Sequence, residues 1–119
     1  MTKRFLFILR KSSYNGIYVQ EMVDIILTTA AFEQDTSVLL LDDAVFHLKT
    51  NQNAQNSGYK NTTTLFDLFP TMDINLLFVE SESMAERGLI PEMLTQSVQF
   101  QSRDTLVDFM TQFDVVFSS

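Results

Sequence analysis

Short runs of apolar residues recur along this chain of 119 residues and are separated by polar segments. Four of the runs are nearly continuous rather than alternating, which is typical of strands in a sheet that is covered on both faces. A fifth run alternates Val98 and Phe100 with polar neighbours, as expected for a strand nearer an edge. The buried strands are predicted at Arg4–Leu9, Ser37–Leu41, Ile74–Val79 and Phe113–Phe117, and the fifth strand at Ser97–Gln101.

Two longer segments between these runs have the spacing of amphipathic helices. In the first, apolar residues recur at intervals of three and four, which predicts a helix over Ile17–Phe32. Asn15 and Gly16 form a turn into this helix. A second helix is predicted over Asp104–Gln112, with Ser102 placed to cap its N-terminus.

Two shorter helices are also predicted. After the third strand, Ser83 and Glu86 have capping-box spacing, and Gly88 is placed to end that helix. A further helical piece is predicted over Thr63–Phe69. The polar segment His47–Thr64 breaks the alternation of strands and helices and is interpreted either as a solvated loop or as a loop that contacts a partner.

The alternation of strands and helices predicts the fold class. Strands joined through helices need crossover connections, which produce a mainly parallel sheet with helices on both faces. The sequence therefore predicts an α/β protein, a three-layer α/β/α sandwich. The length fits one domain covering residues 1–119.

Composition narrows the function classes. The formal net charge of −7 argues against long-range attraction to nucleic acid phosphates. No apolar stretch is long enough for a transmembrane helix, and the apolar run near the start is followed by Arg10 and Lys11 rather than by a cleavage site, so a cytoplasmic protein is expected. The chain has no cysteine, which excludes disulfides and thiolate metal sites. Its 11 phenylalanines are many for this length and suggest a partner interface in addition to a core.

Ligand sites in open parallel sheets form beyond the carboxyl ends of the strands. This rule selects three segments here, Arg10–Ser13, Asp42–Asp43 and Glu80–Ser83. The turn that includes the first of these carries hydroxyls and Gly16 before a helix, as in phosphate-binding loops. Its spacing matches neither the P-loop nor the dinucleotide fingerprint, so an ordinary turn is the preferred interpretation.

Acidic residues after two strands raise the question of a metal site. Asp42, Asp43 and Glu80 supply the oxygen ligands that a divalent cation prefers. Arg10 and Lys11 stand after the first strand, however, and their charges would repel a metal ion. We therefore predict no metal site.

Catalysis by acidic groups or by histidine is the remaining chemical possibility. One of the same three carboxylates can act as an acid or base only if burial raises its pKa. His47 is the single histidine and lacks the partners of a metal site or a catalytic triad, so a structural or surface role is expected. No catalytic residue and no cofactor is predicted from these residues alone.

Three blocks of sequence carry a family resemblance. They are VLLLDDAVFHL (Val38–Leu48), LFVESESMAERGL (Leu77–Leu89) and FDVVF (Phe113–Phe117). Together with the first strand and helix, they resemble the DsrE/DsrF/DsrH family of sulfur-relay proteins, and within it the DsrF-type or TusC branch. The resemblance spans essentially the whole chain and implies a three-layer fold with a five-stranded parallel sheet.

The resemblance also implies partners. Proteins of this branch are expected in a heterohexamer with TusB-like and TusD-like subunits, which relays persulfide sulfur from TusA towards TusE and the tRNA thiolase. The product is the 2-thio group on the wobble uridine of certain tRNAs, without direct nucleic acid binding by this subunit. Because the subunits of the family resemble each other, a homo-oligomer of the isolated chain is also conceivable.

One position separates this chain from the active members of the family. The sulfur-carrying cysteine of the TusD-type subunit lies just after the third strand, a few residues before an Arg-Gly pair. When Arg87 and Gly88 are placed on that pair, Glu80 occupies the cysteine position. A carboxylate cannot form a persulfide, so the resemblance implies a non-catalytic structural subunit. The alternative is a flavodoxin-like module that binds a small molecule or nucleotide through Ser12–Gly16.

Overall fold

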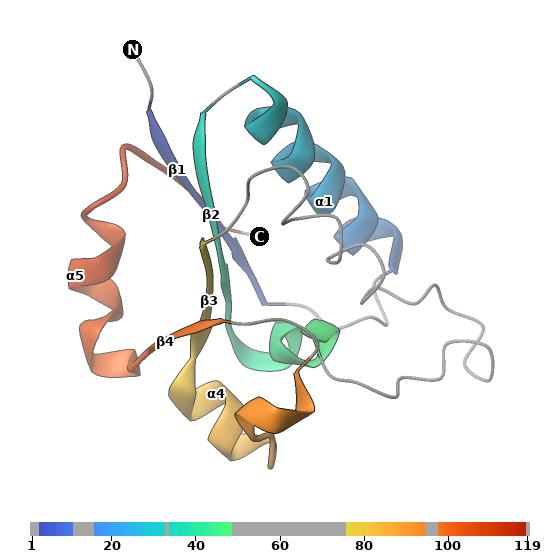
Figure 1. Ribbon diagram of the computed structural model, residues 1–119, viewed down its shortest axis with the longest axis vertical. Helices are drawn as coiled ribbons and strands as arrows, with labels where there is room; N and C mark the ends of the chain where they lie inside the picture. Colours follow the sequence, from blue (N-terminus) through green and yellow to red (C-terminus); the bar gives the residue numbers. More distant parts are fainter. Residues whose placement is uncertain (1–2, 11–15, 33, 49–75, 95–97, 119) are drawn as a thin grey trace.

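A five-stranded parallel sheet forms the centre of the molecule, with the strand order β4-β3-β2-β1-β5 (Figure 1). The computed structural model describes residues 3–10, 16–32, 34–48, 76–94 and 98–118. The strands are β1 (Arg4–Leu9), β2 (Asp35–Leu40), β3 (Leu76–Glu80), β4 (Gln99–Gln101) and β5 (Val115–Ser118). The α-helices are α1 (Gly16–Ala31), α4 (Ser81–Glu86) and α5 (Leu106–Met110), and the 3₁₀ helices are η2 (Asp42–Leu48), η4 (Pro91–Met93) and η5 (Arg103–Thr105).

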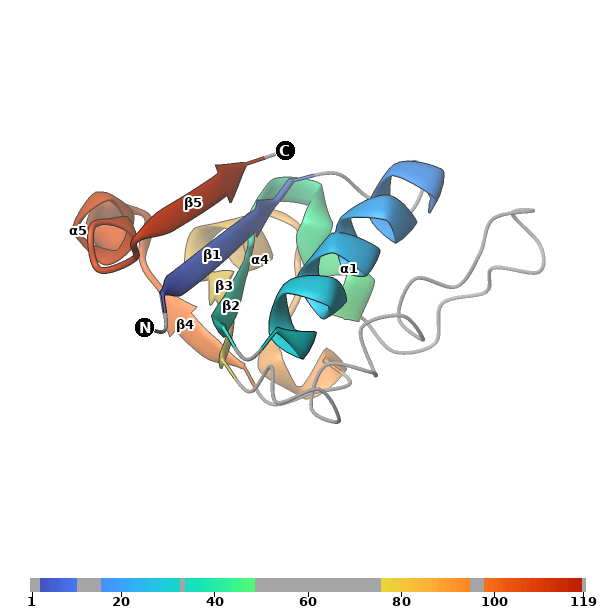
Figure 2. The same ribbon diagram turned by 90° about the horizontal axis from the view of Figure 1, so that it is seen from above.

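Helices α1 and α5 cover opposite faces of the sheet (Figure 2). In β1, Phe7 and Leu9 face α1, whereas Leu6 and Ile8 face α5, because successive side chains of a strand point to opposite faces. All four side chains are buried, which explains why the run is continuously apolar. This arrangement confirms the predicted three-layer α/β/α fold with its five-stranded parallel sheet.

The return of the chain from β4 to β5 determines where α5 lies. These two strands form opposite edges of the sheet, so the connecting residues must cross the sheet. Leu106 and Phe109 of α5, with Phe113 just after it, pack against Leu6 and Phe78 on this face. This connection therefore completes the hydrophobic core between the sheet and α5.

Four of the five predicted strands have the expected character, and one does not. Strand β1 matches its predicted bounds, β2 and β3 are shifted by one or two residues, and β4 is an edge strand as expected. The prediction that Phe113–Phe117 is a strand covered on both faces is wrong. Strand β5 begins at Val115 and lies at the sheet edge, with Val116 40% and Phe117 48% exposed. Only Phe113, just before the strand, is buried.

Helix α1 confirms the first helix prediction almost residue for residue. The segment predicted as Asp104–Gln112 is shorter in α-form, because its first turn is the 3₁₀ helix η5. Ser102 is the residue before η5, but its side chain makes no cap hydrogen bond. The prediction for Thr63–Phe69 and the loop after Leu48 lie outside the described residues. Within the described part, no helix is long and apolar enough to cross a membrane.

Gly88 ends α4 as the sequence predicted. It adopts a φ of +69°, and the backbone N–H groups of Leu89 and Gly88 donate to the carbonyl oxygens of Met84 (2.9 Å) and Ala85 (3.2 Å). This is the pattern of a helix closed by a left-handed residue. The capping-box prediction is wrong, because α4 begins at Ser81 and Ser83 lies inside the helix.

Replacing Gly88 by alanine is expected to lower the free energy of unfolding by about 1 kcal/mol, since the left-handed conformation is strained for a residue with a Cβ atom. The added Cβ would meet no atom within 4 Å, so strain alone accounts for the loss. Urea unfolding measures it, and Gly88→Asn should cost less because asparagine tolerates this conformation. An unchanged unfolding midpoint for Gly88→Ala would contradict the assignment.

Candidate functional site

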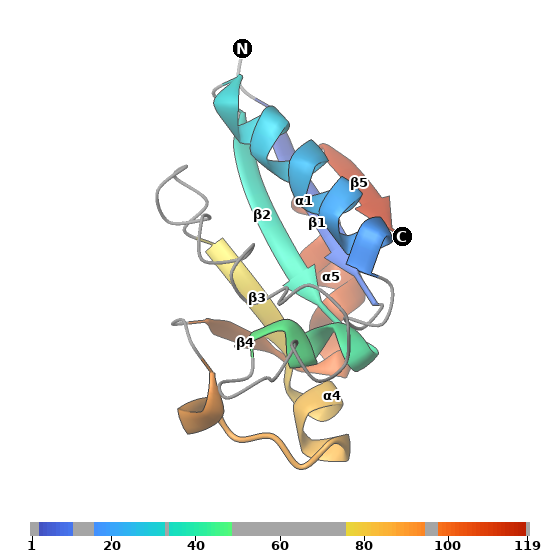
Figure 3. The ribbon, with the colours of Figure 1, turned by 90° about the vertical axis from the view of Figure 1, so that its right-hand side faces the viewer.

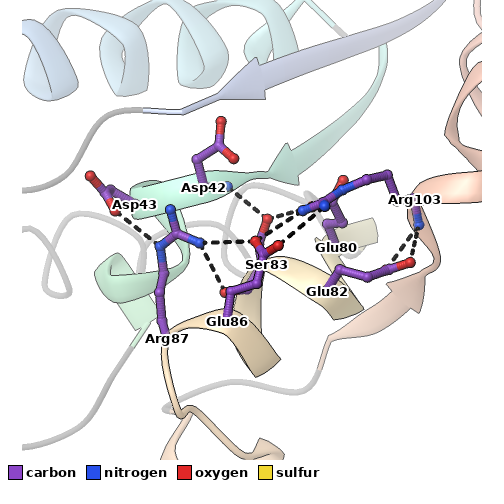
Figure 4. Close-up of polar contacts among 8 residues, drawn as sticks. All are labelled: Asp42, Asp43, Glu80, Glu82, Ser83, Glu86, Arg87 and Arg103. Carbon is purple, nitrogen blue, oxygen red and sulfur yellow. Dashed lines mark hydrogen bonds and ion pairs between the residues drawn. The ribbon is translucent and has the colours of Figure 1, made fainter.

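Polar side chains gather at the carboxyl ends of β2, β3 and β4 (Figure 4). The segments after β2 and β3, η2 and α4, lie at the same end of the sheet (Figure 3). The sequence selected both of these segments, and the structure brings them together through direct hydrogen bonds. We call the set of residues drawn in Figure 4 the carboxyl-end cluster; it comprises Asp42, Asp43, Glu80, Glu82, Ser83, Glu86, Arg87 and Arg103.

Glu80 is the buried acidic residue at the centre of the cluster. It is the last residue of β3 and is only 4% exposed. Its Oε1 atom accepts hydrogen bonds from the Ser83 hydroxyl (2.5 Å) and from Nη2 (2.7 Å) and Nε (3.2 Å) of Arg103. A buried carboxylate needs such partners, because desolvating an unpaired charge is costly.

Arg103 connects this carboxylate to the outer surface of α4. Its guanidinium also donates to both carboxylate oxygens of Glu86, at 3.0 and 3.2 Å. Its backbone N–H donates to the carboxylate of Glu82, at 2.9 and 3.0 Å. The residue that opens η5 is therefore fixed to α4 through the carboxylates of Glu82 and Glu86 and to the end of β3 through that of Glu80, which ties the crossover after β4 to this part of the sheet.

The pKa of Glu80 is lowered from its ordinary value. Burial of the carboxyl acts to raise the pKa, but the hydrogen bonds from Arg103 and Ser83, with the positive charges of Arg103 and Arg10, outweigh burial. Hydrogen bonds from Arg103 likewise lower the pKa of the exposed Glu86. The hydrogen bonds with Glu80 and then with Glu86 raise the pKa of Arg103. Glu80 is thus ionised at neutral pH, which is the opposite of the raised pKa that an acid–base role requires.

Ser83 links the cluster to the end of β2. Its Oγ atom accepts a hydrogen bond from the backbone N–H of Asp42 at 2.9 Å while donating to Glu80. Asp42 has a φ of +52°, an uncommon conformation for a residue other than glycine. Beside it, Arg87 donates from Nε to Asp43 (2.9 Å) and from Nη1 to the carbonyl oxygen of Ser83 (3.2 Å). These contacts hold η2 against α4.

The cluster has the character of a cross-linked structural network. Among the described residues, no group of three or more histidine, cysteine, aspartate or glutamate side chains could hold a metal ion. The positive charge of Arg10, which follows the first strand, acts to lower the pKa of Glu80. His47 is fully buried in η2. The turn Ser12–Gly16 lies largely outside the described residues.

The sequence analysis missed Arg103, the cation that completes the cluster. It lies two residues after the end of β4, with Ser102 between them. The rule that selected the residues after three other strands would have selected Arg103 had it been applied to the fifth predicted strand. The pairing of β4 with β3 then places it beside Glu80, because Glu80 is in register with Gln101.

Protonation of Glu80 is expected to destabilise the fold in acid. A carboxyl whose pKa is lower in the folded state contributes stability that is complete above the unfolded value of about 4.3 and is lost as the pH falls through the folded value. Glu80→Gln should therefore flatten the decline in unfolding free energy below about pH 5, measured by urea unfolding at several pH values.

The exposed Glu92 of η4 offers a matched control for that measurement. Glu92→Gln should leave the acid decline unchanged. If Glu80→Gln and wild type lose stability in parallel as the pH falls, the ionised network is not what stabilises this end of the sheet.

The fold and the cluster define a parallel α/β protein whose polar network occupies the carboxyl edge of the sheet. Comparison with known proteins gives the family: the sequence profile of the DsrE/DsrF-like family matches residues 3–118, and the chain belongs to this family. The resemblance drawn from the three sequence blocks is confirmed.

Named relatives extend this comparison. The chain is 30% identical to the intracellular sulfur oxidation protein DsrF of Allochromatium vinosum over 119 residues, which is 100% of this chain and 87% of the relative. It is also 30% identical to the TusC homolog of Pseudomonas aeruginosa over 116 residues, covering 98% of both chains. The crystal structure of the ychN protein from E. coli has a TM-score of 0.82 at 13% identity, covering 99% of this chain and 100% of that chain, and it supports the fold.

Proposed function

We propose that this chain is a structural, non-catalytic subunit of a sulfur-relay complex of the TusBCD type that supports 2-thiolation of the wobble uridine of tRNA. Membership in the DsrE/DsrF-like family and the names TusC and DsrF among its relatives support a role in sulfur handling. The observation that carries the non-catalytic assignment is the buried Glu80, at the position where the family resemblance places the sulfur-carrying cysteine of the active subunit.

The chemistry of Glu80 explains why this subunit would carry no sulfur. Persulfide formation needs a thiolate, and the chain has no cysteine. The negative charge of Glu80 would also disfavour a second anion at the same place. Its Oε1 already accepts from Ser83 and Arg103, so the carboxylate serves to hold β3, α4 and η5 together.

A subunit of this kind needs partners that do the chemistry. In the proposal these are TusB-like and TusD-like subunits, with the cysteine on the latter, and TusA and TusE interact with the complex they form. Large apolar side chains on the surface provide area for such contacts. The exposed examples are Ile25, Phe32, Ile90, Phe100, Val107, Val116 and Phe117.

The match to DsrF favours a second candidate process. That relative is named for intracellular sulfur oxidation, and its identity to this chain equals that of the TusC homolog. Sulfur oxidation is therefore the second process in which we propose that this chain could take part, instead of tRNA thiolation. The 2-thiouridine content of tRNA from a deletion strain distinguishes the two processes.

Co-expression tests membership in the complex. The chain is expected to co-purify with its TusB-like and TusD-like counterparts and to elute with them in size-exclusion chromatography. Glu80→Gln should still assemble, because glutamine is isosteric and can accept from Arg103 through its amide oxygen. A chain that elutes alone, although folded, would refute the proposed assembly.

A further inference from the structure

A cavity lies on the α5 side of the sheet, between α5 and the edge strand β4. Its volume is about 380 Å³, which lies within the usual range of small-molecule pockets. Gln99 of β4 is in register with Phe78, and Phe78 packs in the α5 layer, so both side chains face this side of the sheet. The cavity shares no residue with the carboxyl-end cluster.

The lining of the cavity combines buried aromatic rings with polar side chains. Phe78 and Phe109, 6% and 7% exposed, supply apolar surface. Along η5 and α5 the polar residues are spaced by three and four, which places them on one side of the helix. Apart from Arg4, the polar lining consists of Gln99, Gln101, Thr105, Asp108 and Gln112. Such a lining suits a small molecule that has both an apolar part and a polar group.

Asp108 supplies the charge of this cavity that has no counter-ion. In the described part of the chain, its carboxylate forms no ion pair and no hydrogen bond. Arg4 is already engaged, since its Nε lies 3.4 Å from Oδ2 of Asp35 and its Nη1 donates to the carbonyl oxygen of Gln112 at 2.8 Å. The side-chain amides of Gln99 and Gln112 have no hydrogen-bond partner among the described residues. The cavity therefore presents one unpaired negative charge together with free amide oxygens.

We propose that this cavity binds a small aliphatic amine in its protonated form. The ammonium group donates to the carboxylate of Asp108 and to the amide oxygens of Gln99 and Gln112, all of which are acceptors. The methylene chain lies against Phe78 and Phe109, where it is removed from water. The net charge of −7 favours the approach of a cation. A neutral or anionic ligand would leave the charge of Asp108 unmatched.

Two sources carry this ammonium chemistry, a free amine and the lysine side chain of another protein. Diaminobutane represents the first source, and a lysine blocked at both its amino and carboxyl ends represents the second. The side-chain amide signals of Gln99, Gln101 and Gln112 in the NMR spectrum of the isotope-labelled full chain report binding of either probe. Diaminobutane should shift these signals with half-saturation at about 1–10 mM, the affinity expected for a ligand of so few atoms. A weaker effect of the blocked lysine assigns the site to a free amine, and an equal or stronger effect assigns it to a protein side chain.

Two controls isolate the ammonium and its carboxylate. Butanediol has the same chain length without the charge and should cause no saturable shift. Asp108→Asn should weaken the binding of diaminobutane about fivefold, the upper range for an exposed ion pair. Asp104→Asn removes the same charge from an exposed residue of η5 outside the cavity and should change the affinity by less than about twofold, because salt screens a distant charge.

Both substitutions are isosteric changes at exposed sites, and a dispersed NMR spectrum verifies that each variant is folded. Equal binding of butanediol and diaminobutane, equal effects of the two aspartate variants, or shifts that never saturate would overturn the inference. Because no other subunit is present, the outcome is independent of the proposed sulfur-relay function.

Discussion

Truncating Phe7 to alanine is expected to lower the free energy of unfolding by about 3–5 kcal/mol, the usual cost of removing a buried aromatic side chain. Phe7 is fully buried in β1, a strand with neighbours on both sides. Its ring lies 5.3 Å from that of Phe117 and 6.4 Å from that of Phe5. The substitution therefore leaves a cavity in the α1 layer and removes the ring that stacks on both Phe5 and Phe117. Urea unfolding followed by circular dichroism measures the loss.

Phe32 provides the matched comparison, since it is 73% exposed just after α1. Phe32→Ala should change the free energy of unfolding by no more than about 0.5 kcal/mol. Equal losses in the two variants would mean that the α1 layer is not the core of the protein in solution.

Replacing Arg103 by methionine is expected to lower the free energy of unfolding, and by more than the same change at Arg87, which does not contact Glu80. The change leaves the buried carboxylate of Glu80 with the Ser83 hydroxyl but without its cation. Breaking a fully buried ion pair costs about 3–5 kcal/mol, and the 48% exposure of the Arg103 side chain reduces this figure because water screens the pair. Arg103→Lys should recover only part of the loss, because an ammonium lacks the planar guanidinium that joins Glu80 to Glu86.

A double-mutant cycle separates the ion pair from lost packing. In the background of Glu80→Gln, the loss caused by Arg103→Met should be measurably smaller than in wild type, since no buried charge remains to be left unpaired. The analogous change Arg87→Met removes a guanidinium that does not contact Glu80 and should show no such coupling to it. Strictly additive effects of Glu80→Gln and Arg103→Met would show that the two residues do not act as a pair.

The pattern of apolar residues was sufficient to predict the layered fold, because a strand buried on both faces must be apolar at every position. Strand β1 is the clearest case, with Leu6 and Phe7 buried in different layers. A continuous apolar run did not predict the position of β5 correctly. Such a run can form a central strand with a neighbour on each side or an edge strand with solvent on one side, and the sequence does not distinguish the two. Strand order is set by which crossovers pack best, and the sequence alone does not specify it.

The candidate site could be predicted only in part from the sequence. The rule that ligand sites lie beyond the carboxyl ends of parallel strands identifies Asp42, Asp43 and Glu80 from the sequence alone. It could not show that Glu80 is buried, nor that Ser83 turns inward from α4 to bridge Glu80 and the backbone of Asp42, because both depend on how α4 begins directly after β3. Glu80 is ionised because Arg103 lies beside it, and the pairing of β4 with β3 is what brings Arg103 close to Glu80.

The distribution of phenylalanines fits a protein with both a core and contact surfaces. Phe78, Phe109 and Phe113 form an edge-to-face group in the α5 layer, with ring centroids 4.6 and 5.2 Å apart for successive pairs. Phe32 and Phe100 are exposed. These two side chains are therefore available for contact with a partner, and the partner interface that the phenylalanine content suggests stays a prediction.

The 2-thiouridine content of bulk tRNA tests the central proposal most directly. A strain that lacks this chain should lose the 2-thio group, and re-expression of wild type should restore it. Glu80→Gln should restore it equally, because the account assigns Glu80 a structural role that a neutral isostere retains near pH 7. Normal 2-thiouridine in the deletion strain would contradict the proposed pathway, and a folded Glu80→Gln variant that assembles but fails to restore the modification would contradict the non-catalytic role.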